Sequence, residues 1–272
     1  MDSHRLLIVT GKGGAGRSAI TAALALNAAR RGRRVLALAM TDRSGLAGHL
    51  GMRDIGYAPQ RIRPGLHIAA VSPPAALEEY LRLRLRVPML GPATRAFRLL
   101  ADTVPGIRET VVAGKAVYEA FRGQWDVVVA DGPPIGQVAG FLRAPATIES
   151  LVPSGVVREQ AAWMRECLVA SGLVIASLPE ELAALETRAL LDALEPEPPV
   201  EIAAVAVNRV LEPLEGVGPG QGRVAEAALH HRRLVAAQAQ WIDPEDITLP
   251  FVFGRHTPAE VAEVIADVWG SA

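Results

Sequence analysis

The sequence predicts a single α/β domain, with a mostly parallel sheet flanked by helices, and three observations support this prediction. A short apolar run, Leu6 to Val9, leads through a glycine-rich loop into a helical stretch. Later apolar runs of strand length alternate with longer stretches of helical pattern, as expected for βαβ units. The chain contains no internal repeat and no stretch typical of an interdomain linker, so residues 1–272 are expected to form a single domain.

The composition of the chain argues against several classes of function. The 272 residues are 50% hydrophobic and carry a net charge of -1, which argues against a general electrostatic affinity for nucleic acid. The lone Cys167 permits neither an intrachain disulfide nor a CxxC zinc site. No signal peptide is visible, and no apolar stretch approaches the roughly 18–20 residues that a membrane span needs. The expected location is therefore the cytoplasm.

The glycine-rich loop has the spacing of a phosphate-binding P-loop, G-x-x-x-x-G-K-[ST]. Backbone N–H groups of such a loop point inward, and the start of the following helix adds its dipole, so the loop can hold polyphosphate. Arg17 stands where lysine is standard, and Lys12 follows the first glycine. Only Lys12 and Lys115 are lysines among 28 basic residues, so arginine bias alone could explain Arg17. The residues predicted to cradle the phosphates are Gly11, Lys12, Gly13, Gly14, Ala15, Gly16, Arg17 and Ser18.

Two acidic residues follow predicted strands. The first helix should end near Gly32, a usual C-terminal cap residue, and the next strand, 35–40, leads to Asp42. The apolar strand 126–131 ends in Asp131, followed by Gly-Pro-Pro-Ile-Gly-Gln. Both side chains should lie at the carboxyl edge of the sheet, where α/β proteins bind ligands, although an Asp there can also simply cap a turn. Asp131, with Ser18, is the predicted Mg²⁺ site, because this ion prefers oxygen ligands.

The middle of the chain is the hardest part to interpret. After a predicted strand at 66–71, residues 81–87 alternate as in a strand, yet Leu77, Leu81 and Leu85 are four apart, which favours a helix. Two more helices are predicted at 93–102 and 107–121. These leucines either form a docking face or belong to the core. Further elements are expected at 173–177, 200–207, 223–241 and 258–269.

The pattern G-K-G-G-x-G-[KR]-[ST] resembles the deviant Walker A motif of the arsenite-pump and tail-anchored-protein targeting ATPases, which are relatives of the MinD/ParA ATPases. The resemblance implies that Lys12 reaches across a dimer interface to the partner's nucleotide. It implies that Asp42, in switch I, orients or deprotonates the attacking water, with Arg17 in the place of the P-loop lysine. Residues 131–137 resemble switch II, although Ile135 and Gln137 replace the usual threonine and histidine.

The same resemblance implies roles for three other parts of the chain. Asn208, at the end of a predicted strand, would recognise the adenine edge, although Asn is also a common turn residue. Pro250 and Phe251 would lie in the loop that packs on adenine. The segment from about 73 to 123, between switch I and switch II, would be a short helical elaboration that handles a client or membrane partner.

The sequence therefore predicts a dimeric switch that uses ATP and Mg²⁺, with hydrolysis coupled to opening and closing. The dimer would be a homodimer or a heterodimer with a related ATPase, and its partner a hydrophobic protein client or a membrane-associated protein. Arg17, Arg43, Ile135 and Gln137 favour a first alternative, a slow or non-hydrolysing regulatory subunit. A second alternative is a MinD/ParA-like positioning ATPase. No cysteine cluster is present to bind a metalloid, which argues against arsenite export.

Overall fold

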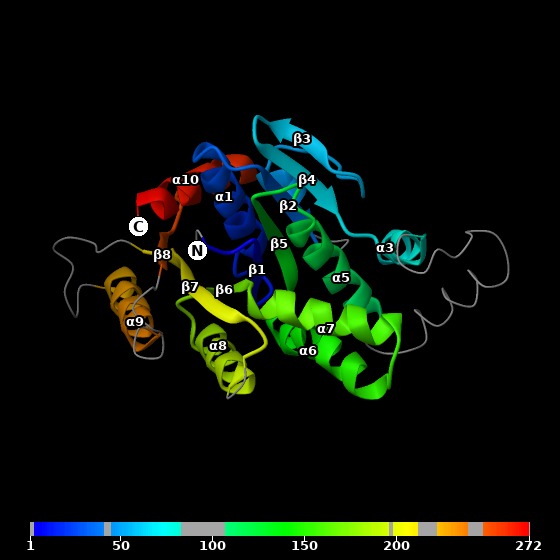
Figure 1. The fold of residues 1–272 in the computed structure, drawn as a ribbon. Coiled ribbons are helices and arrows are strands. Elements are labelled where there is room, and N and C mark those ends of the chain that lie inside the picture. The colour runs from blue at the N-terminus through cyan, green and yellow to red at the C-terminus, as the bar shows by residue number, and fades with distance from the viewer. Residues whose placement is uncertain are drawn as a thin grey trace.

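The computed structural model describes residues 3–40, 45–82, 107–195, 198–211, 222–238 and 247–271. An eight-stranded sheet in the order β3-β4-β2-β5-β1-β6-β7-β8 forms its centre (Figure 1). Neighbouring strands run parallel except for the antiparallel β3–β4 pair. The predicted α/β class with a mostly parallel sheet is confirmed. The strands are β1 (Leu6–Gly11), β2 (Val35–Ala39), β3 (Gln60–Arg63), β4 (Leu66–Ala70), β5 (Val127–Pro134), β6 (Gly172–Ser177), β7 (Glu201–Val210) and β8 (Ile247–Pro250).

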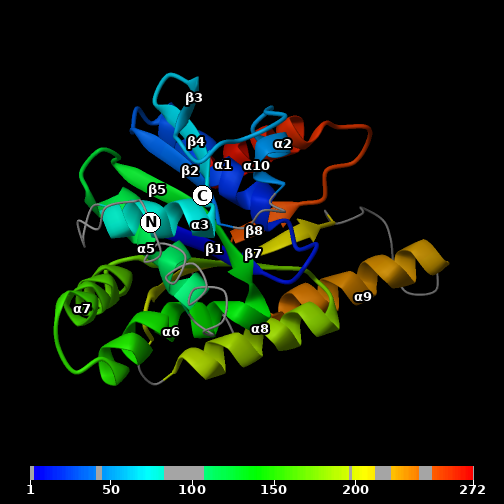
Figure 2. The same ribbon diagram turned by 90° about the vertical axis from the view of Figure 1, so that its right-hand side faces the viewer.

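Helices cover both faces of the sheet (Figure 2). One face carries α1 (Arg17–Arg30), α2 (Leu46–His49) and α10 (Pro258–Ser271). Among the described residues, the opposite face carries five helices, and α9 (Arg223–Gln238) packs beside β7. The five are α3 (Pro73–Tyr80), α5 (Ile107–Phe121), α6 (Ile135–Leu151), α7 (Val156–Val169) and α8 (Glu181–Leu194).

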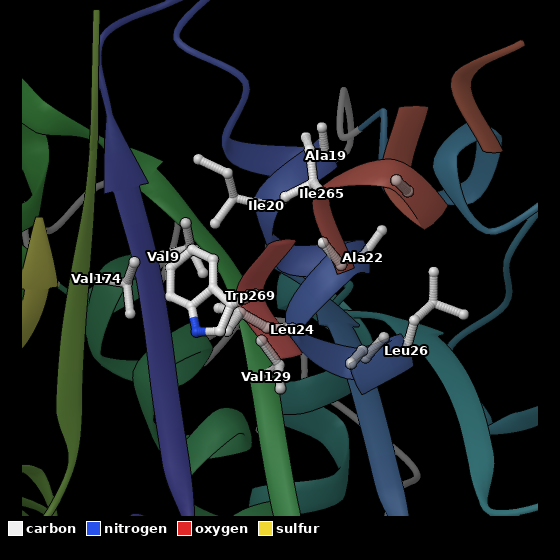
Figure 3. Packing of buried hydrophobic residues seen from close by; sticks show 14 of the residues in the cluster. Val9, Ala19, Ile20, Ala22, Leu24, Leu26, Val129, Val174, Ile265 and Trp269 are labelled. Carbon is white, nitrogen blue, oxygen red and sulfur yellow. The ribbon is translucent and has the colours of Figure 1, made fainter. Parts of the chain in front are cut away.

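The central strand β1 is buried on both sides. Its side chains alternate, so that Leu7 and Val9 pack toward α1 and α10, while Leu6 and Ile8 pack toward α5 and α6. A strand covered on both faces needs apolar residues at every position, which explains the uninterrupted apolar run in the sequence. The packing on the first face is shown in Figure 3, which includes Val9, Leu24, Val129, Val174 and Trp269.

Most predicted elements lie within a few residues of the observed ones, with the following differences. The strand β3 and the helices α2, α6 and α7 have no counterpart among the predicted elements, and β8 covers residues expected only as a loop. Leu77 and Leu81 are both buried, so these two leucines do not form an exposed docking face. Residues 83–106, which include Leu85 and the predicted helix 93–102, lie outside the described residues.

A buried group of charged residues joins α3 to α5. The Lys115 ammonium lies 2.6 Å from Glu79 Oε2 and 2.8 Å from Glu119 Oε1. Burial alone would raise the pKa of Glu79, but hydrogen bonds from Lys115 and Tyr57 outweigh it and hold that pKa below its usual value. We call Glu79, Lys115 and Glu119 the α3–α5 charge cluster. It fixes the two helices that flank residues 83–106.

Candidate functional site

The glycine-rich loop lies at the carboxyl end of β1, between β5 and β6, and its two ends are tightly packed. A Cβ on Gly11 would lie 2.4 Å from the Ala176 carbonyl oxygen, and one on Gly16 would lie 2.2 Å from Asn208 Nδ2. Gly16 also has a φ of 91°, in the left-handed region that disfavours a side chain. These two glycines are therefore required by the packing of the loop itself.

The middle of the loop is open. No atom lies within 4 Å of where a Cβ on Gly13 or Gly14 would be. The helix α1 begins at Arg17 directly after the loop, with no side-chain cap and no acidic residue in its first turn. The positive end of the helix dipole therefore acts on the space beside the loop, which suits an anion such as a polyphosphate.

The two predicted metal-binding residues lie together. The Ser18 hydroxyl donates a 2.6 Å hydrogen bond to Asp131 Oδ2, and Asp131 is only 1% exposed at the end of β5. A hydroxyl and a carboxylate are oxygen donors of the type that Mg²⁺ prefers, and this ion commonly takes few protein ligands beside phosphate and water. The described residues contain no cluster of three or more His, Cys, Asp or Glu side chains that could hold a metal. The donor set thus fits Mg²⁺ bound with a nucleotide rather than a closed metal site.

The backbone after Asp131 is held by side chains from the β1–α1 unit. Arg17 Nη1 donates a 2.6 Å hydrogen bond to the Gly132 carbonyl, and the Thr10 hydroxyl donates a 2.8 Å hydrogen bond to the Pro133 carbonyl. Arg17 was predicted at the phosphates, and here it also contacts switch II. Thr10 was not among the predicted site residues, because a Thr at a strand end has no distinguishing pattern in the sequence.

Asn208 lies beneath the loop. Its Nδ2 donates to the Ala15 carbonyl at 2.9 Å, and its Oδ1 accepts a hydrogen bond from the Arg209 amide at 2.9 Å. The side chain is buried, and it therefore holds the P-loop in place. An amide has further donor and acceptor capacity, so its predicted contact with adenine stays a prediction.

Two aromatic rings lie near the end of β7. The Phe251 amide donates to the Val210 carbonyl at 2.9 Å, which places Phe251, directly after Pro250, next to the strand end that carries Asn208. The rings of Phe251 and Phe253 lie 4.7 Å apart between centroids, and both are exposed. The contact of Pro250 and Phe251 with adenine stays a prediction. Phe253 was not among the predicted site residues, because only the contact between the two rings points to it.

Of the predicted catalytic residues Asp42 and Lys12, only Lys12 lies among the described residues. Asp42 lies in residues 41–44, outside the described residues. Lys12 is described, and within the described part of the chain its ammonium group has no hydrogen-bond or ion-pair partner.

None of the helices among the described residues is long and apolar enough to cross a membrane.

A parallel sheet whose central strand leads through a glycine-rich loop into a helix, with a Ser–Asp pair beside the loop, defines the class of P-loop nucleotide-binding proteins. Within that class the chain belongs to the anion-transporting ATPase (ArsA) family, whose profile matches residues 4–188. The predicted family resemblance is confirmed, and with it an ATPase that binds nucleotide. Asn208, Pro250 and Phe251 lie beyond the matched residues.

Individual relatives agree with this assignment. The chain is 32% identical to the ATPase BagA of Mycobacterium tuberculosis over 244 residues, which cover 82% of this chain and 72% of that protein. It is 31% identical to an arsenical pump-driving ATPase of Escherichia coli over 163 residues, 54% of this chain and 27% of that protein. An arsenical pump-driving ATPase of Acidiphilium multivorum is 29% identical over 164 residues, with 54% and 27% covered.

Proposed function

We propose that the chain is a molecular switch that uses ATP and Mg²⁺, closes into a dimer when ATP binds and reopens after hydrolysis. The observation that carries this proposal is Lys12. Lys12 is a partly exposed residue of the P-loop, and its ammonium has no partner among the described residues. A long, flexible lysine side chain in this position can reach a phosphate on a neighbouring subunit, as the family resemblance implies.

The nucleotide site is supported by the loop and by the Ser18–Asp131 pair. The backbone N–H groups of residues 13–18 would hold the phosphates, with room provided by Gly13 and Gly14. Ser18 and Asp131 would hold Mg²⁺, which supplies positive charge against the phosphate oxygens when bound. Asn208 keeps the loop in register through the Ala15 carbonyl. On the resemblance, we assign the orientation or deprotonation of the attacking water to Asp42.

The apolar surface near the loop supports a second copy, or a related ATPase, as the dimer partner. The strand β6 lies next to β1, with Ala176 opposite Gly11, and α8 begins four residues after β6 ends. Leu182 and Leu185, in the first turns of α8, are both more than half exposed. Covering these two exposed leucines with another subunit would remove apolar surface from water. We infer that the subunit whose nucleotide Lys12 contacts lies on that side.

The helices after switch II support a surface that responds to the nucleotide. The helix α6 begins at Ile135, directly after switch II, and ends at Leu151, which is 75% exposed. Val156 and Val157 open α7 and are also exposed. We infer that this turn, together with the helical segment from about 73 to 123, meets the hydrophobic protein client or membrane-associated partner.

One observation favours a slow or non-hydrolysing regulatory subunit as a second candidate function. The Arg17 guanidinium already donates to the Gly132 carbonyl, so part of its hydrogen-bonding capacity is directed at switch II rather than at phosphate. A subunit of this kind would bind ATP and close, but would turn ATP over slowly, either alone or in a heterodimer.

Sedimentation velocity with and without Mg·ATP tests the dimer. We expect ATP to shift the wild-type protein toward a dimer, because Lys12 then gains a phosphate partner on the other subunit. Lys12→Ala should abolish the shift and retain nucleotide affinity within a few fold, since the loop amides remain. Lys12→Arg, which keeps the charge, is the matched control and should retain part of the shift.

Two results would contradict the proposal. A wild-type protein with no measurable affinity for a fluorescent ATP analogue would remove the nucleotide site. A protein that binds ATP but stays monomeric, alone and with a related ATPase, would remove the dimer.

A further inference from the structure

Three successive residues at the end of β5 are each held by a side chain from the β1–α1 unit. Ser18 binds the Asp131 carboxylate, Arg17 binds the Gly132 carbonyl and Thr10 binds the Pro133 carbonyl. The first two belong to the phosphate and metal machinery described above. Thr10 is different, because its hydroxyl is neutral, fully buried and directed away from the loop toward switch II.

The switch II segment also pairs with its neighbouring strands, with Pro134 opposite Gly11 and with the Met40 amide donating to the Asp131 carbonyl at 3.1 Å. A Cβ on Gly132 would lie 2.8 Å from both the Ile8 side chain and the Val9 carbonyl oxygen, so the turn packs directly on β1. Pro133 and Pro134 have no N–H group, and their φ angles are fixed by the ring. Their carbonyls are therefore the only backbone hydrogen-bonding groups they offer, and Thr10 takes one of them at 2.8 Å.

The next residue after this turn begins α6. Pro134 is the N-cap of the helix, and Ile135 is its first residue. The direction in which α6 leaves the sheet thus follows from where the Pro133–Pro134 pair is fixed. A hydrogen bond at Pro133 acts where β5 passes into the helix that ends at the exposed Leu151.

An ordinary buried threonine satisfies its hydroxyl locally, and Thr21 in α1 does so. Its hydroxyl is equally buried and donates to the Arg17 carbonyl one turn earlier at 2.9 Å. The Thr10 bond instead joins residues 123 positions apart and connects the end of β1 to the end of the neighbouring strand β5. The two threonines have the same chemistry and the same burial, and they differ in whether the bond reaches switch II.

We propose that Thr10 is a positioning residue that fixes switch II against the P-loop strand through the Pro133 carbonyl, so that the state of the γ-phosphate is transmitted to α6. This inference rests on the proposed function, in which switch II distinguishes ATP from ADP. Without the bond, ATP and ADP would still bind the loop, but the turn would no longer be held where a γ-phosphate contact can move it.

The test compares Thr10→Val, Thr10→Ser and Thr21→Val. Val has the shape of Thr without the hydroxyl, and Ser keeps the hydroxyl. We measure affinity for ATP and ADP with fluorescent analogues, and amide hydrogen exchange over residues 131–151. Thr10→Val should reduce the preference for ATP over ADP by about 10-fold, because it leaves the Pro133 carbonyl without its donor. It should also abolish the ATP-dependent change in exchange at the start of α6.

The controls separate positioning from stability. Thr21→Val should lower the unfolding midpoint in urea about as much as Thr10→Val, yet leave the ATP/ADP preference unchanged. Thr10→Ser should keep the preference within about twofold, because its donor is intact.

Several results would overturn the inference. A preference unchanged in Thr10→Val, or reduced equally in Thr21→Val, would show that Thr10 has only a structural role. Loss of the preference in Thr10→Ser would show that the methyl group matters and the hydrogen bond does not. A wild-type protein that binds neither nucleotide would overturn the proposed function, and the inference with it, whereas the other results leave the proposed function intact.

Discussion

At the scale of single residues, Arg17 is the largest departure from the P-loop pattern. A P-loop lysine is a compact charge that moves little as charge develops during phosphoryl transfer. Arginine keeps the charge, but it is planar, bulkier and suited to forked contacts. In the structure one of its N–H groups donates to the Gly132 carbonyl at 2.6 Å. Binding of ATP depends mainly on the loop amides, whereas transition-state stabilisation depends on tighter geometry.

We therefore predict that Arg17→Lys raises the rate of ATP hydrolysis. A misplacement of about 1 Å can reduce a rate on the order of 100-fold, so a gain of about 10- to 100-fold is expected, with little change in affinity. Thr10 still holds the switch II turn in this variant. Steady-state phosphate release measures the gain, and Asp42→Asn, which should eliminate turnover, serves as the control. Brisk wild-type hydrolysis that Arg17→Lys leaves unimproved would contradict the prediction and the regulatory-subunit candidate.

The residues that the sequence predicted well are those whose role follows from local spacing. Ser18 and Asp131 were expected at one site, and the Ser18 hydroxyl lies 2.6 Å from Asp131 Oδ2, while their binding of Mg²⁺ stays a prediction. Thr10, Phe253 and the contact of Asn208 with the P-loop could not be predicted. Asn208 and Ala15 are 193 positions apart, and only the packing of β7 beside β6 brings them together.

At the scale of elements, strands buried on both faces were predictable and exposed ones were not. The central strands are continuous apolar runs because helices cover both sides of the sheet. The edge strand β3 reads Gln-Arg-Ile-Arg and is mostly exposed, so no apolar pattern indicates it. The helix α6 continues through Pro145, a residue type that usually ends a helix. No helix was predicted over residues 135–151 from the sequence.

The α3–α5 charge cluster should determine how firmly these two helices are held. Lys115→Met removes the cation between Glu79 and Glu119 and leaves the buried carboxylates without it. We expect the free energy of unfolding to fall by about 3–5 kcal/mol in urea denaturation. Arg188→Ala, which breaks an exposed pair with Asp192 within α8, is the matched control and should cost at most about 0.5 kcal/mol.

The pKa of Glu79, in the same cluster, determines how its contribution to the free energy of unfolding should change with pH. The Glu79 pKa is lower in the folded protein than in the unfolded chain, so its contribution is complete above the unfolded value of about 4.3. That contribution is lost as the pH falls through the lower, folded pKa. The difference in stability between wild type and Glu79→Gln should therefore shrink in acid. Equal losses from Lys115→Met and Arg188→Ala would show that the cluster contributes no more than a surface pair.

At the scale of the whole molecule, the two faces of the sheet have different relations to the nucleotide. The first face carries α1, α2 and α10, which pack on the sheet mainly through apolar residues, and α1 contacts switch II through Arg17 and Ser18 in its first turn. The second face carries α6, which starts at switch II and packs against α5, α7 and α8. A change at switch II therefore reaches the second face first. The net charge of -1 argues against a general attraction of the whole surface for anions.

This asymmetry predicts where amide hydrogen exchange differs between the ADP-bound and ATP-bound protein. We expect changes in protection of about tenfold or more along α6, at the α6–α7 turn and in α5. In the proposed function ATP moves switch II, α6 starts directly after it, and α5 and α7 pack against α6. The helix α10 packs on α1 and α2 and serves as the internal control, with unchanged protection expected. Changes confined to the loop, or spread equally over α10 and α6, would show that the nucleotide state is not transmitted through α6. The turn at Leu151 and Val156 would then be an exposed apolar patch without a link to ATP.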